Sequence, residues 1–330
     1  FINQHVFADE LPKKELEATF KSALDRIFSK VDTKNPINPK TQPEKAWREL
    51  VRRLDIKLYN GKLYFDKDGV WSNDENLLIR AVFDEGVYLT QPQIKEFLKQ
   101  ASVICERVDD KEFHIQLSNN HMIRNSPQVI NMNGGFTPYM MNTAYDPNAY
   151  DKHVDEFLDF VTCGDKEIRA NIEEMLGHIL WTRGFSHKVF FLVNSSGKNG
   201  KSTFLKMVSN FVGEPTSKLS IDAFDDSTLL SSLDGKLVNL GDDIDAIYLD
   251  KSKNFKTIAS GDTITIRAIY SHGFELTNRA SLIFTANRMP TFKYKTVGLE
   301  RRIQISPCNA HVTKPNPNLD KQLSTENAKS

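Results

Sequence analysis

The chain has 330 residues, and its 43 Lys and Arg balance its 43 Asp and Glu. This balance argues against a uniformly basic nucleic-acid-binding protein, so any contacts with nucleic acid must come from local basic patches. Hydrophobic residues make up 39% of the chain, but no apolar run approaches the roughly 18 residues of a membrane span, so we expect no membrane association. Three scattered cysteines without a CxxC pair argue against a disulfide framework or a Cys-rich zinc site and favour a cytoplasmic location.

The part of the chain before residue 189 is expected to be mainly helical with one hairpin. Apolar side chains recur at helical spacing, and a Lys-, Asn- and Pro-rich stretch at Lys34–Pro43 interrupts them. Asn60-Gly61 is a two-residue turn signal between alternating apolar residues. The predicted elements are a helix within residues 1–30, a helix over 44–54, a hairpin over 56–71, helices over 76–83 and 91–102, a strand over 113–117, and helices over 153–162 and 166–181.

The stretch Val189–Leu205, VFFLVNSSGKNGKSTFL, carries the clearest motif of the chain. Its apolar start predicts a buried strand, its polar middle predicts a loop, and a helix begins around Gly200. This is the context of a phosphate-binding P-loop, whose backbone N–H groups hold phosphate oxygens. Lys201 would reach the β- and γ-phosphates of ATP, and the Ser202 hydroxyl would ligate Mg²⁺. The expected phosphate-binding residues are Ser196, Gly197, Lys198, Asn199, Gly200, Lys201, Ser202 and Thr203.

Ser195 is a departure from the usual P-loop pattern, which has a glycine at this position. A bare GKS sequence also occurs in an ordinary Gly/Ser turn before an amphipathic helix. The apolar strand before the loop, the helix after it and an acidic pair further along the chain favour the phosphate-binding interpretation.

Two carboxylates end the next apolar strand, Lys236–Asp243. In a P-loop NTPase one carboxylate belongs to the Mg²⁺ shell, and the next can orient the attacking water. We assign Asp242 to the metal and Asp243 to the water, with the reverse assignment also possible. The alternative is an acidic turn after a core strand, but a position about 40 residues after the loop favours the catalytic interpretation.

A hairpin is predicted after a helix over 251–260, with strands over 263–268 and 274–277. Its tip carries a cation, an aromatic ring and an imidazole, which together could hold phosphates and stack on a base. An ordinary surface hairpin is an equally good interpretation of these residue types alone. The candidate DNA-binding residues are Arg267, Tyr270 and His272, with Lys256 on the preceding helix as a weaker candidate.

Three further polar residues lie at the ends of the last predicted strands. Asn287 follows the buried strand Ala280–Ala286 and could hydrogen-bond the γ-phosphate or the attacking water. Arg301 and Arg302 come at the start of another strand, and an arginine near a γ-phosphate stabilises the charge of the transition state. Without the other motifs, a surface ion pair would be the favoured interpretation of the two arginines.

The order of these five motifs resembles the superfamily 3 helicases, and among them the poxvirus-type helicase module of phage and plasmid primase-helicases. The hairpin between the acidic strand and the strand before Asn287 is the most diagnostic feature of that resemblance. The opening segment, FADELPKKELEATFKSAL, also resembles the C-terminal tail of a phage primase domain. The matching motifs are NGKST (Asn199–Thr203), GDD (Gly241–Asp243), GDTITIRAIYSHGFEL (Gly261–Leu276), LIFTANRMP (Leu282–Pro290) and LERRIQI (Leu299–Ile305).

The resemblance implies an AAA+-like α/β P-loop NTPase with a mostly parallel sheet flanked by helices, preceded by a mainly helical α+β accessory domain. Residues 1–33 would be a primase tail or linker helix, 34–150 the accessory domain, and 151–330 a helical lead-in with the ATPase core. The C-terminal region of such a module would be truncated here, and a primase or primase-polymerase domain would be covalently linked in the full-length protein.

The activity implied by the resemblance is ATP- and Mg²⁺-dependent unwinding of DNA by a hexameric ring that translocates on single-stranded or forked DNA. The protein would be encoded by a phage or mobile element and act in the cytoplasm of a bacterial host. Lys201, Ser202, Asp242, Asp243 and Asn287 would form the site of one subunit. A neighbouring subunit would supply Arg301 or Arg302 as an arginine finger, and the hairpin residues would line the central channel.

Two other functions fit parts of the pattern. An ATP-dependent binding module could oligomerise on DNA or on a replication partner without unwinding, and Ser195 would then reflect weakened hydrolysis. A small-molecule P-loop kinase is disfavoured, because the chain has a hairpin and an oligomer-type arginine where a kinase needs an acceptor pocket and a lid.

Overall fold

A computed structural model describes residues 39, 41–67, 70–108, 113–131, 135–183, 187–194, 197–244, 248–249, 253–266, 274–292 and 297–325. Several predicted features lie outside these residues: the helix within 1–30, Ser195, Ser196, and the hairpin-tip residues Arg267, Tyr270 and His272. The described residues divide into two compact units: the first comprises those up to 67 together with 72–108, and the second comprises 70–71, at the start of β3, together with those from 113 onward. No helix in the described ranges combines the length and apolar character needed to cross a bilayer.

The first unit combines three helices with a small sheet, as the periodicity predicts. Trp47, Leu50 and Phe97 are buried in its core, where α3 packs on α5. Asn60 and Gly61 have φ values of 46° and 77°, which is the left-handed pair that a two-residue hairpin turn requires. The elements are α3 (Pro43–Arg53), β1 (Lys57–Tyr59), β2 (Lys62–Lys67), β3 (Val70–Ser72), α4 (Glu75–Asp84), α5 (Gln91–Ile104) and β4 (Glu106–Arg107), with sheet order β3-β2-β1-β4.

The second unit contains a small sheet, two lead-in helices and a larger parallel sheet. The small sheet has the order β7-β6-β5-β8 and is formed by β5 (Ile115–Leu117), β6 (His121–Ile123), β7 (Val129–Asn131) and β8 (Met140–Met141). The elements that follow are α6 (Lys152–Val161), α7 (Lys166–Ile179), β9 (Val189–Val193), α8 (Lys201–Val212), β10 (Thr216–Ser217), two short 3₁₀ helices (Ile221–Asp225 and Leu229–Leu233), β11 (Val238–Ile244), β12 (Tyr248–Leu249), α9 (Lys253–Ala259), β13 (Thr263–Ile266), β14 (Phe274–Thr277), β15 (Ser281–Ala286), β16 (Thr291–Phe292), α10 (Val297–Glu300), β17 (Ile303–Pro307) and α11 (Leu319–Gln322).

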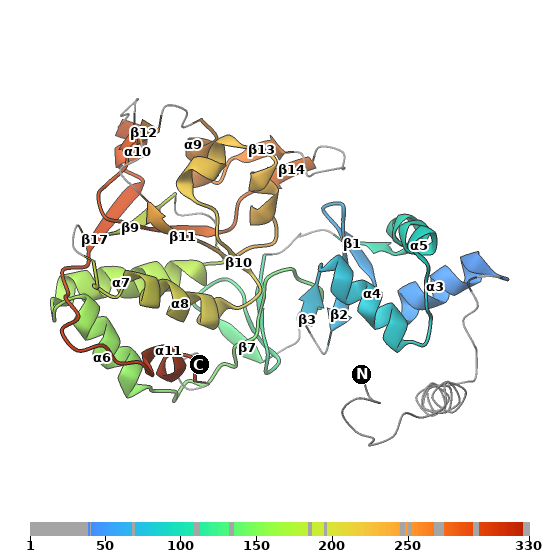
Figure 1. Ribbon diagram of the computed structural model, residues 1–330, viewed down its shortest axis with the longest axis horizontal. Coiled ribbons are helices and arrows are strands. Elements are labelled where there is room, and N and C mark those ends of the chain that lie inside the picture. The colour runs from blue at the N-terminus through green and yellow to red at the C-terminus, as the bar shows by residue number, and fades with distance from the viewer. Residues whose placement is uncertain are drawn as a thin grey trace, which may run out of the picture. The chain divides into compact units, whose positions relative to one another are not determined.

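The larger sheet has five strands in the order β10-β11-β15-β9-β17, and every neighbouring pair is parallel. Side chains of β9 alternate between two cores: Phe190 and Leu192 pack on one face, and Val189 and Phe191 on the other. Figure 1 shows α7 and α8 against the first face and α9 with the β13–β14 hairpin against the second. Because both faces are covered, a continuous apolar run is the expected sequence for a central strand. The fold is therefore mixed α/β with a parallel sheet, as predicted.

The structure differs from the prediction at the acidic strand. Asp242 and Asp243 lie inside β11, which continues to Ile244, and the pairing with β15 is irregular between Gly241 and Ile244. Gly241 is required here because a Cβ at this position would lie 2.4 Å from Phe284 Cδ1 and 2.9 Å from the carbonyl oxygen of Leu219. The prediction included both carboxylates in the strand but ended it at Asp243, one residue before Ile244.

The arginine pair also has a different setting from the predicted one. Arg301 and Arg302 follow a short helix, α10, which the periodicity did not predict, and β17 begins only at Ile303. A four-residue helix is too short to show an apolar stripe, so its sequence carries no helical signal.

Candidate functional site

The loop between β9 and α8 bends with two residues in the left-handed region. Gly200 has a φ of 85° and Lys198 a φ of 58°. Gly200 is the residue just before the helix, and a Cβ there would lie 3.3 Å from Val161 Cγ2 on α6. A glycine is therefore favoured both by the backbone angle and by the close approach of α6. The loop thus leads directly into the first turn of α8, where the Lys201 amide donates to Asn199 Oδ1 at 3.4 Å. Backbone N–H groups at the start of a helix are the arrangement that binds anions.

Lys201 is held at the carboxyl ends of two neighbouring strands. Lys201 is buried, with only 7% of the residue exposed. The Nζ donates hydrogen bonds to the carbonyl oxygen of Asn194 at 2.9 Å, to the carbonyl oxygen of Ala286 at 3.1 Å and to Oδ1 of Asn287 at 3.0 Å. Asn194 follows β9 and Ala286 ends β15, and these strands are adjacent. Two predicted site residues, Lys201 and Asn287, are thus in direct contact.

Asp242 lies next to the first turn of α8. Thr285 Oγ1 on β15 donates a hydrogen bond to Asp242 Oδ1 at 2.6 Å, and Ser202 Oγ lies 3.5 Å from the same oxygen. Thr285 is fully buried, whereas Asp242 is exposed. Two of the predicted site residues, Ser202 and Asp242, therefore lie next to each other, whereas the Asp243 side chain lies outside the described part of the structure.

The C-terminal segment that follows β17 hydrogen-bonds to the loop between β9 and α8. The amide of Cys308 donates to the carbonyl of Val193 at 3.0 Å, and the amide of Val312 donates to the carbonyl of Lys198 at 2.8 Å. Asn194 also donates through its side-chain amide to the carbonyl of Cys308. Burial raises the pKa of the Cys308 thiol to about 12, so this cysteine stays protonated at neutral pH and is no nucleophile. Its part in the site is to supply backbone contacts.

Sequence reasoning missed two residues of this site. Asn194 reads as a loop residue and Thr285 as a β-branched strand residue, so neither type carried a signal. The available clue for Thr285 was its polar side chain in a run of buried residues, because a buried hydroxyl needs a hydrogen-bonding partner.

Arg301 and Arg302 lie at the opposite edge of the sheet from Lys201. The carbonyl of Arg302 accepts a hydrogen bond from the amide of Val189, the first residue of β9, at 2.8 Å. Arg302 Nη1 also donates to the carbonyl of Gly298 at 2.7 Å, whereas Arg301 is exposed. Because all strands are parallel, the amino-terminal edge that holds both arginines is one strand length away from the carboxyl edge that holds Lys201. The two arginines are therefore not brought together with the other predicted site residues of the same chain.

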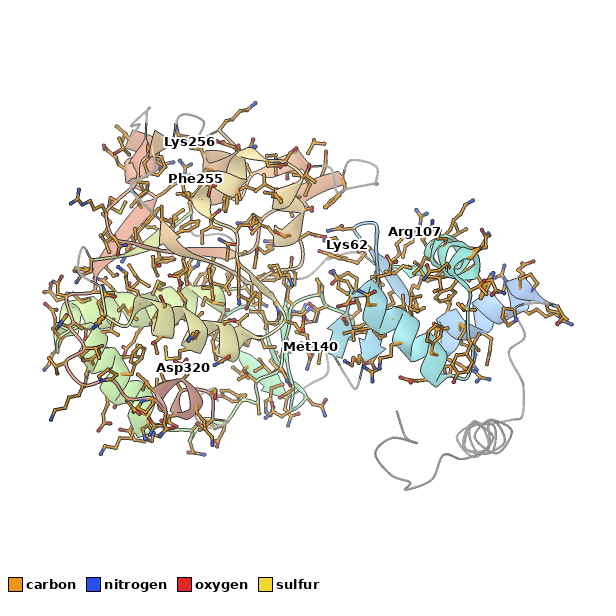
Figure 2. The ribbon with its side chains drawn as sticks, viewed as in Figure 1. Lys62, Arg107, Met140, Phe255, Lys256 and Asp320 are labelled. Carbon is orange, nitrogen blue, oxygen red and sulfur yellow. The ribbon has the colours of Figure 1, made fainter. Side chains whose placement is uncertain are left out.

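The predicted hairpin is present as β13 and β14, which pair in antiparallel register from Thr263–Thr277 to Ile266–Phe274. Its connecting residues, which include the three candidate DNA-binding residues, lie outside the described chain. Lys256 is in the last turn of α9, next to the buried Phe255 (Figure 2). The structure thus places Lys256 on the helix before the hairpin, as predicted.

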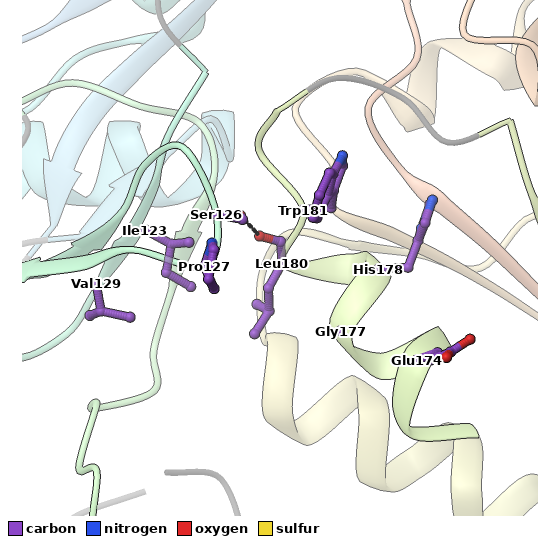
Figure 3. Close-up of a pocket in the computed structure, with 9 residues that line it drawn as sticks. All are labelled: Ile123, Ser126, Pro127, Val129, Glu174, Gly177, His178, Leu180 and Trp181. Atoms are coloured by element: carbon purple, nitrogen blue, oxygen red, sulfur yellow. Dashed lines mark hydrogen bonds between the residues drawn. The ribbon is translucent and has the colours of Figure 1, made fainter. Parts of the chain in front are cut away.

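A cavity of about 520 Å³ lies near the amino-terminal edge of the sheet, away from Lys201 (Figure 3). Its walls are mostly apolar and come from the β6–β7 hairpin and the end of α7, with Pro127, Leu180 and Trp181 among them. His178 at its border bonds Ser281 Oγ through Nδ1 at 2.5 Å, and burial lowers the pKa of this imidazole to about 4. Ser281 begins β15, which places this cavity at the edge opposite the candidate site.

No cluster of three or more metal-binding His, Cys, Asp or Glu side chains occurs in the ranges that the structure describes. A cation at the candidate site would therefore be held by the Asp242 carboxylate and the Ser202 hydroxyl together with oxygens from a ligand.

Parts of the chain match a protein family and a named relative. Residues 192–302 match DUF5906, a family of unknown function. The "Putative helicase L207/L206" of Acanthamoeba polyphaga mimivirus is 26% identical over 164 residues, which cover 47% of this chain and 17% of that protein. The chain thus spans about a sixth of the length of this curated relative.

Solved structures give the same picture of the fold. The apo structure of the NrS-1 C-terminal region matches with a TM-score of 0.57 and 13% identity, covering 88% of this chain and 68% of the other. The A form of the apo NrS-1 C-terminal region matches with a TM-score of 0.56 and 11% identity, covering 86% of this chain and 67% of the other. At these identities the likeness concerns the fold alone.

Proposed function

We propose that the chain is the ATPase motor of a DNA helicase with a P-loop NTPase fold of the superfamily 3 type. The observation that carries this proposal is the position of Lys201, whose ammonium lies at the carboxyl ends of β9 and β15 in contact with Asn287. In open α/β sheets, ligands bind outside the carboxyl ends of the strands. The mimivirus relative, which is named as a helicase, supports the assignment.

In this proposal the triphosphate of ATP takes the place in front of the first turn of α8. The Lys201 ammonium is already desolvated and aimed by three acceptors, so it can transfer hydrogen bonds to phosphate oxygens at small cost. Asn287, released from Lys201, then has its amide available for the γ-phosphate or the attacking water. The backbone N–H groups of Gly197–Thr203 supply the remaining phosphate contacts.

Ser202 and Asp242 lie close enough to share a Mg²⁺ after a small movement. Their oxygens are 3.5 Å apart, whereas neighbouring ligands of an octahedral Mg²⁺ lie about 3 Å apart, so binding would draw the two oxygens together. When bound with ATP, Mg²⁺ would neutralise the charge that develops on the phosphates. Thr285 fixes the carboxylate toward Ser202, and Asp243 remains our proposed residue for orienting water.

The location of the arginines supports a site that is completed by a second subunit. Arg301 and Arg302 lie at the amino-terminal edge of the sheet, so neither reaches the phosphates of its own chain without a rearrangement. In a ring, the same edge of one subunit would face the nucleotide of the next. We therefore propose that one of these arginines acts as a finger in a homo-oligomer, expected to be a hexamer, and that Arg267, Tyr270, His272 and Lys256 contact the DNA strand.

The experiment that tests the proposal measures ATP-driven strand displacement on forked DNA by the full-length protein, together with ATP hydrolysis with and without single-stranded DNA. We expect displacement that requires ATP and hydrolysis that DNA stimulates. DNA binding with ATP-dependent assembly but without displacement would contradict the motor and favour an assembly module. A hydrolysis rate that DNA leaves unchanged, without displacement, would contradict both.

A further inference from the structure

A second cavity, of about 260 Å³, lies beside the loop between β9 and α8. One wall is α6, with the buried Phe157 and the partly exposed Phe160, and the other is the C-terminal segment with Val312 and Leu319. Figure 1 shows α11 next to α6 at this part of the unit. The cavity is thus formed by two segments that are about 150 residues apart in sequence, and both come close to the loop.

Both walls of the cavity touch the loop itself. A Cβ built on Gly200 would lie 3.4 Å from the Phe157 ring, so this ring reaches from the cavity to the residue before α8. On the other wall, the amide of Val312 donates to the carbonyl of Lys198 at 2.8 Å. A nucleotide whose phosphates lie on the loop therefore has this cavity as the adjoining space for its other end.

The lining offers a flat heterocycle an aromatic ring for stacking and polar side chains around it. Phe160 exposes 36% of its surface, and Phe157, Val312 and Leu319 supply further apolar contact. Polar and charged side chains complete the lining: His153, Glu156, Thr313, Lys314, Asn316 and Gln322. Among them, the side-chain amide of Asn316 donates to Gln322 Oε1 at 2.8 Å. An aromatic ring beside several polar side chains is a composition that suits a base stacked on its face and hydrogen-bonded along one edge.

We propose that this cavity binds the purine base of ATP, with Phe160 as the stacking residue. The proposal rests on the proposed function, because the loop must first hold the triphosphate. The proposal has one consequence for the C-terminal segment. The base would contact Leu319 of this segment, and the neighbouring Asp320 already pairs with Lys206 on α8 at 2.6 Å. Bound nucleotide would therefore hold the C-terminal segment against α6 and α8. Figure 2 shows Asp320 on α11.

The test compares two ligands that share the phosphates but differ in the base. Binding of Mg²⁺-ATP and of Mg²⁺-tripolyphosphate is measured by titration calorimetry for the wild type and for Phe160→Ala. We expect Phe160→Ala to bind ATP about tenfold more weakly, because stacking on an aromatic ring contributes roughly 1–3 kcal/mol per base. Its affinity for tripolyphosphate should stay that of the wild type. Phe160→Tyr should restore ATP binding, because it keeps the ring.

The control Tyr88→Ala removes a surface ring of the first unit that is 57% exposed, and it should change neither affinity. Unchanged ATP affinity in Phe160→Ala would overturn the proposal, and so would an equal loss for both ligands, since the ring would then support the loop and not the base. Failure of the proposed function has a different signature. In that case Lys201→Ala would bind both ligands as the wild type does, or the wild type would bind neither.

Discussion

Replacing Thr285 by valine should separate the positioning of Asp242 from the rest of the site. The two side chains have nearly the same shape, so the substitution removes a hydroxyl and leaves the packing of β15 intact. The lost interaction is the 2.6 Å hydrogen bond from Thr285 Oγ1 to Asp242 Oδ1. Hydrogen bonds to charged groups contribute about 1.5–3 kcal/mol. Because Asp242 is exposed, water can take over the hydroxyl's place, and we expect a loss of only about 1 kcal/mol of unfolding free energy.

The effect of Thr285→Val on activity should be larger than its effect on stability. A carboxylate that is no longer held toward Ser202 should bind Mg²⁺ less well, and loss of such an orienting partner typically costs 10–100-fold in metal affinity or activity. We expect kcat/KM for ATP to fall at least about tenfold and the Mg²⁺ concentration at half-maximal rate to rise. The assay is steady-state hydrolysis over a Mg²⁺ series, with urea unfolding for stability.

Thr285→Ser is the matched control, because it keeps the hydroxyl and removes a buried methyl group. It should lose about 1 kcal/mol of stability and retain most of the activity. Thr285→Val should therefore lose mainly activity, whereas Thr285→Ser should lose stability and keep most of its activity. A valine variant with the Mg²⁺ dependence of the wild type, or a serine variant as inactive as the valine variant, would refute the positioning role of Thr285.

Three further predictions concern other parts of the second unit. Gly241→Ala should lower the free energy of unfolding by about 1–3 kcal/mol or more in urea titration, because its Cβ would overlap an aromatic ring at 2.4 Å; an unchanged midpoint would contradict this. His178 has a folded-state pKa of about 4, below its ordinary value of 6.5, so the unfolded chain binds more protons between these values. Stability should therefore fall, by at most about 3 kcal/mol, as the pH falls from 6.5 to 4, and His178→Asn should show a shallower fall. Finally, mixing Lys201→Ala protein with a variant in which Arg301 and Arg302 are both alanine should restore part of the ATP hydrolysis that each lacks alone, whereas no recovery would contradict a finger supplied between subunits.

The central strand and its loop could be predicted from sequence because local rules decide them. A run of five apolar residues bounded by polar ones predicts a strand that is covered on both faces, and β9 has the predicted bounds Val189–Val193. The start of α8 follows from Gly200 and the helix-forming residues after it. Asn287 was a candidate because a polar side chain at the end of an apolar strand has few structural reasons to be there.

The rest of the site depends on contacts between distant segments, which single-sequence periodicity does not contain. Thr285 has the residue type of any strand position, and only the parallel pairing of β15 with β11 brings it to Asp242. The segment after β17 hydrogen-bonds to the loop through backbone amides. Every residue type except proline has such an amide, so the sequence does not predict these contacts either. The sequence predicted the arginines as a finger for a neighbouring subunit only through the family resemblance, because residue type alone does not place them in the fold. Their place at the opposite edge follows only once β17 is known to pair with β9.

The measurement that tests the central claim most directly is ATP hydrolysis by Lys201→Ala beside a matched control, Lys206→Ala. Both lysines belong to α8, but Lys206 is exposed and pairs with Asp320, whereas Lys201 is buried against the ends of β9 and β15. If the loop holds the triphosphate, Lys201→Ala falls to the background rate while Lys206→Ala keeps the wild-type rate, with both proteins folded by circular dichroism. Equal hydrolysis by the wild type and Lys201→Ala would contradict the assignment of the phosphate site.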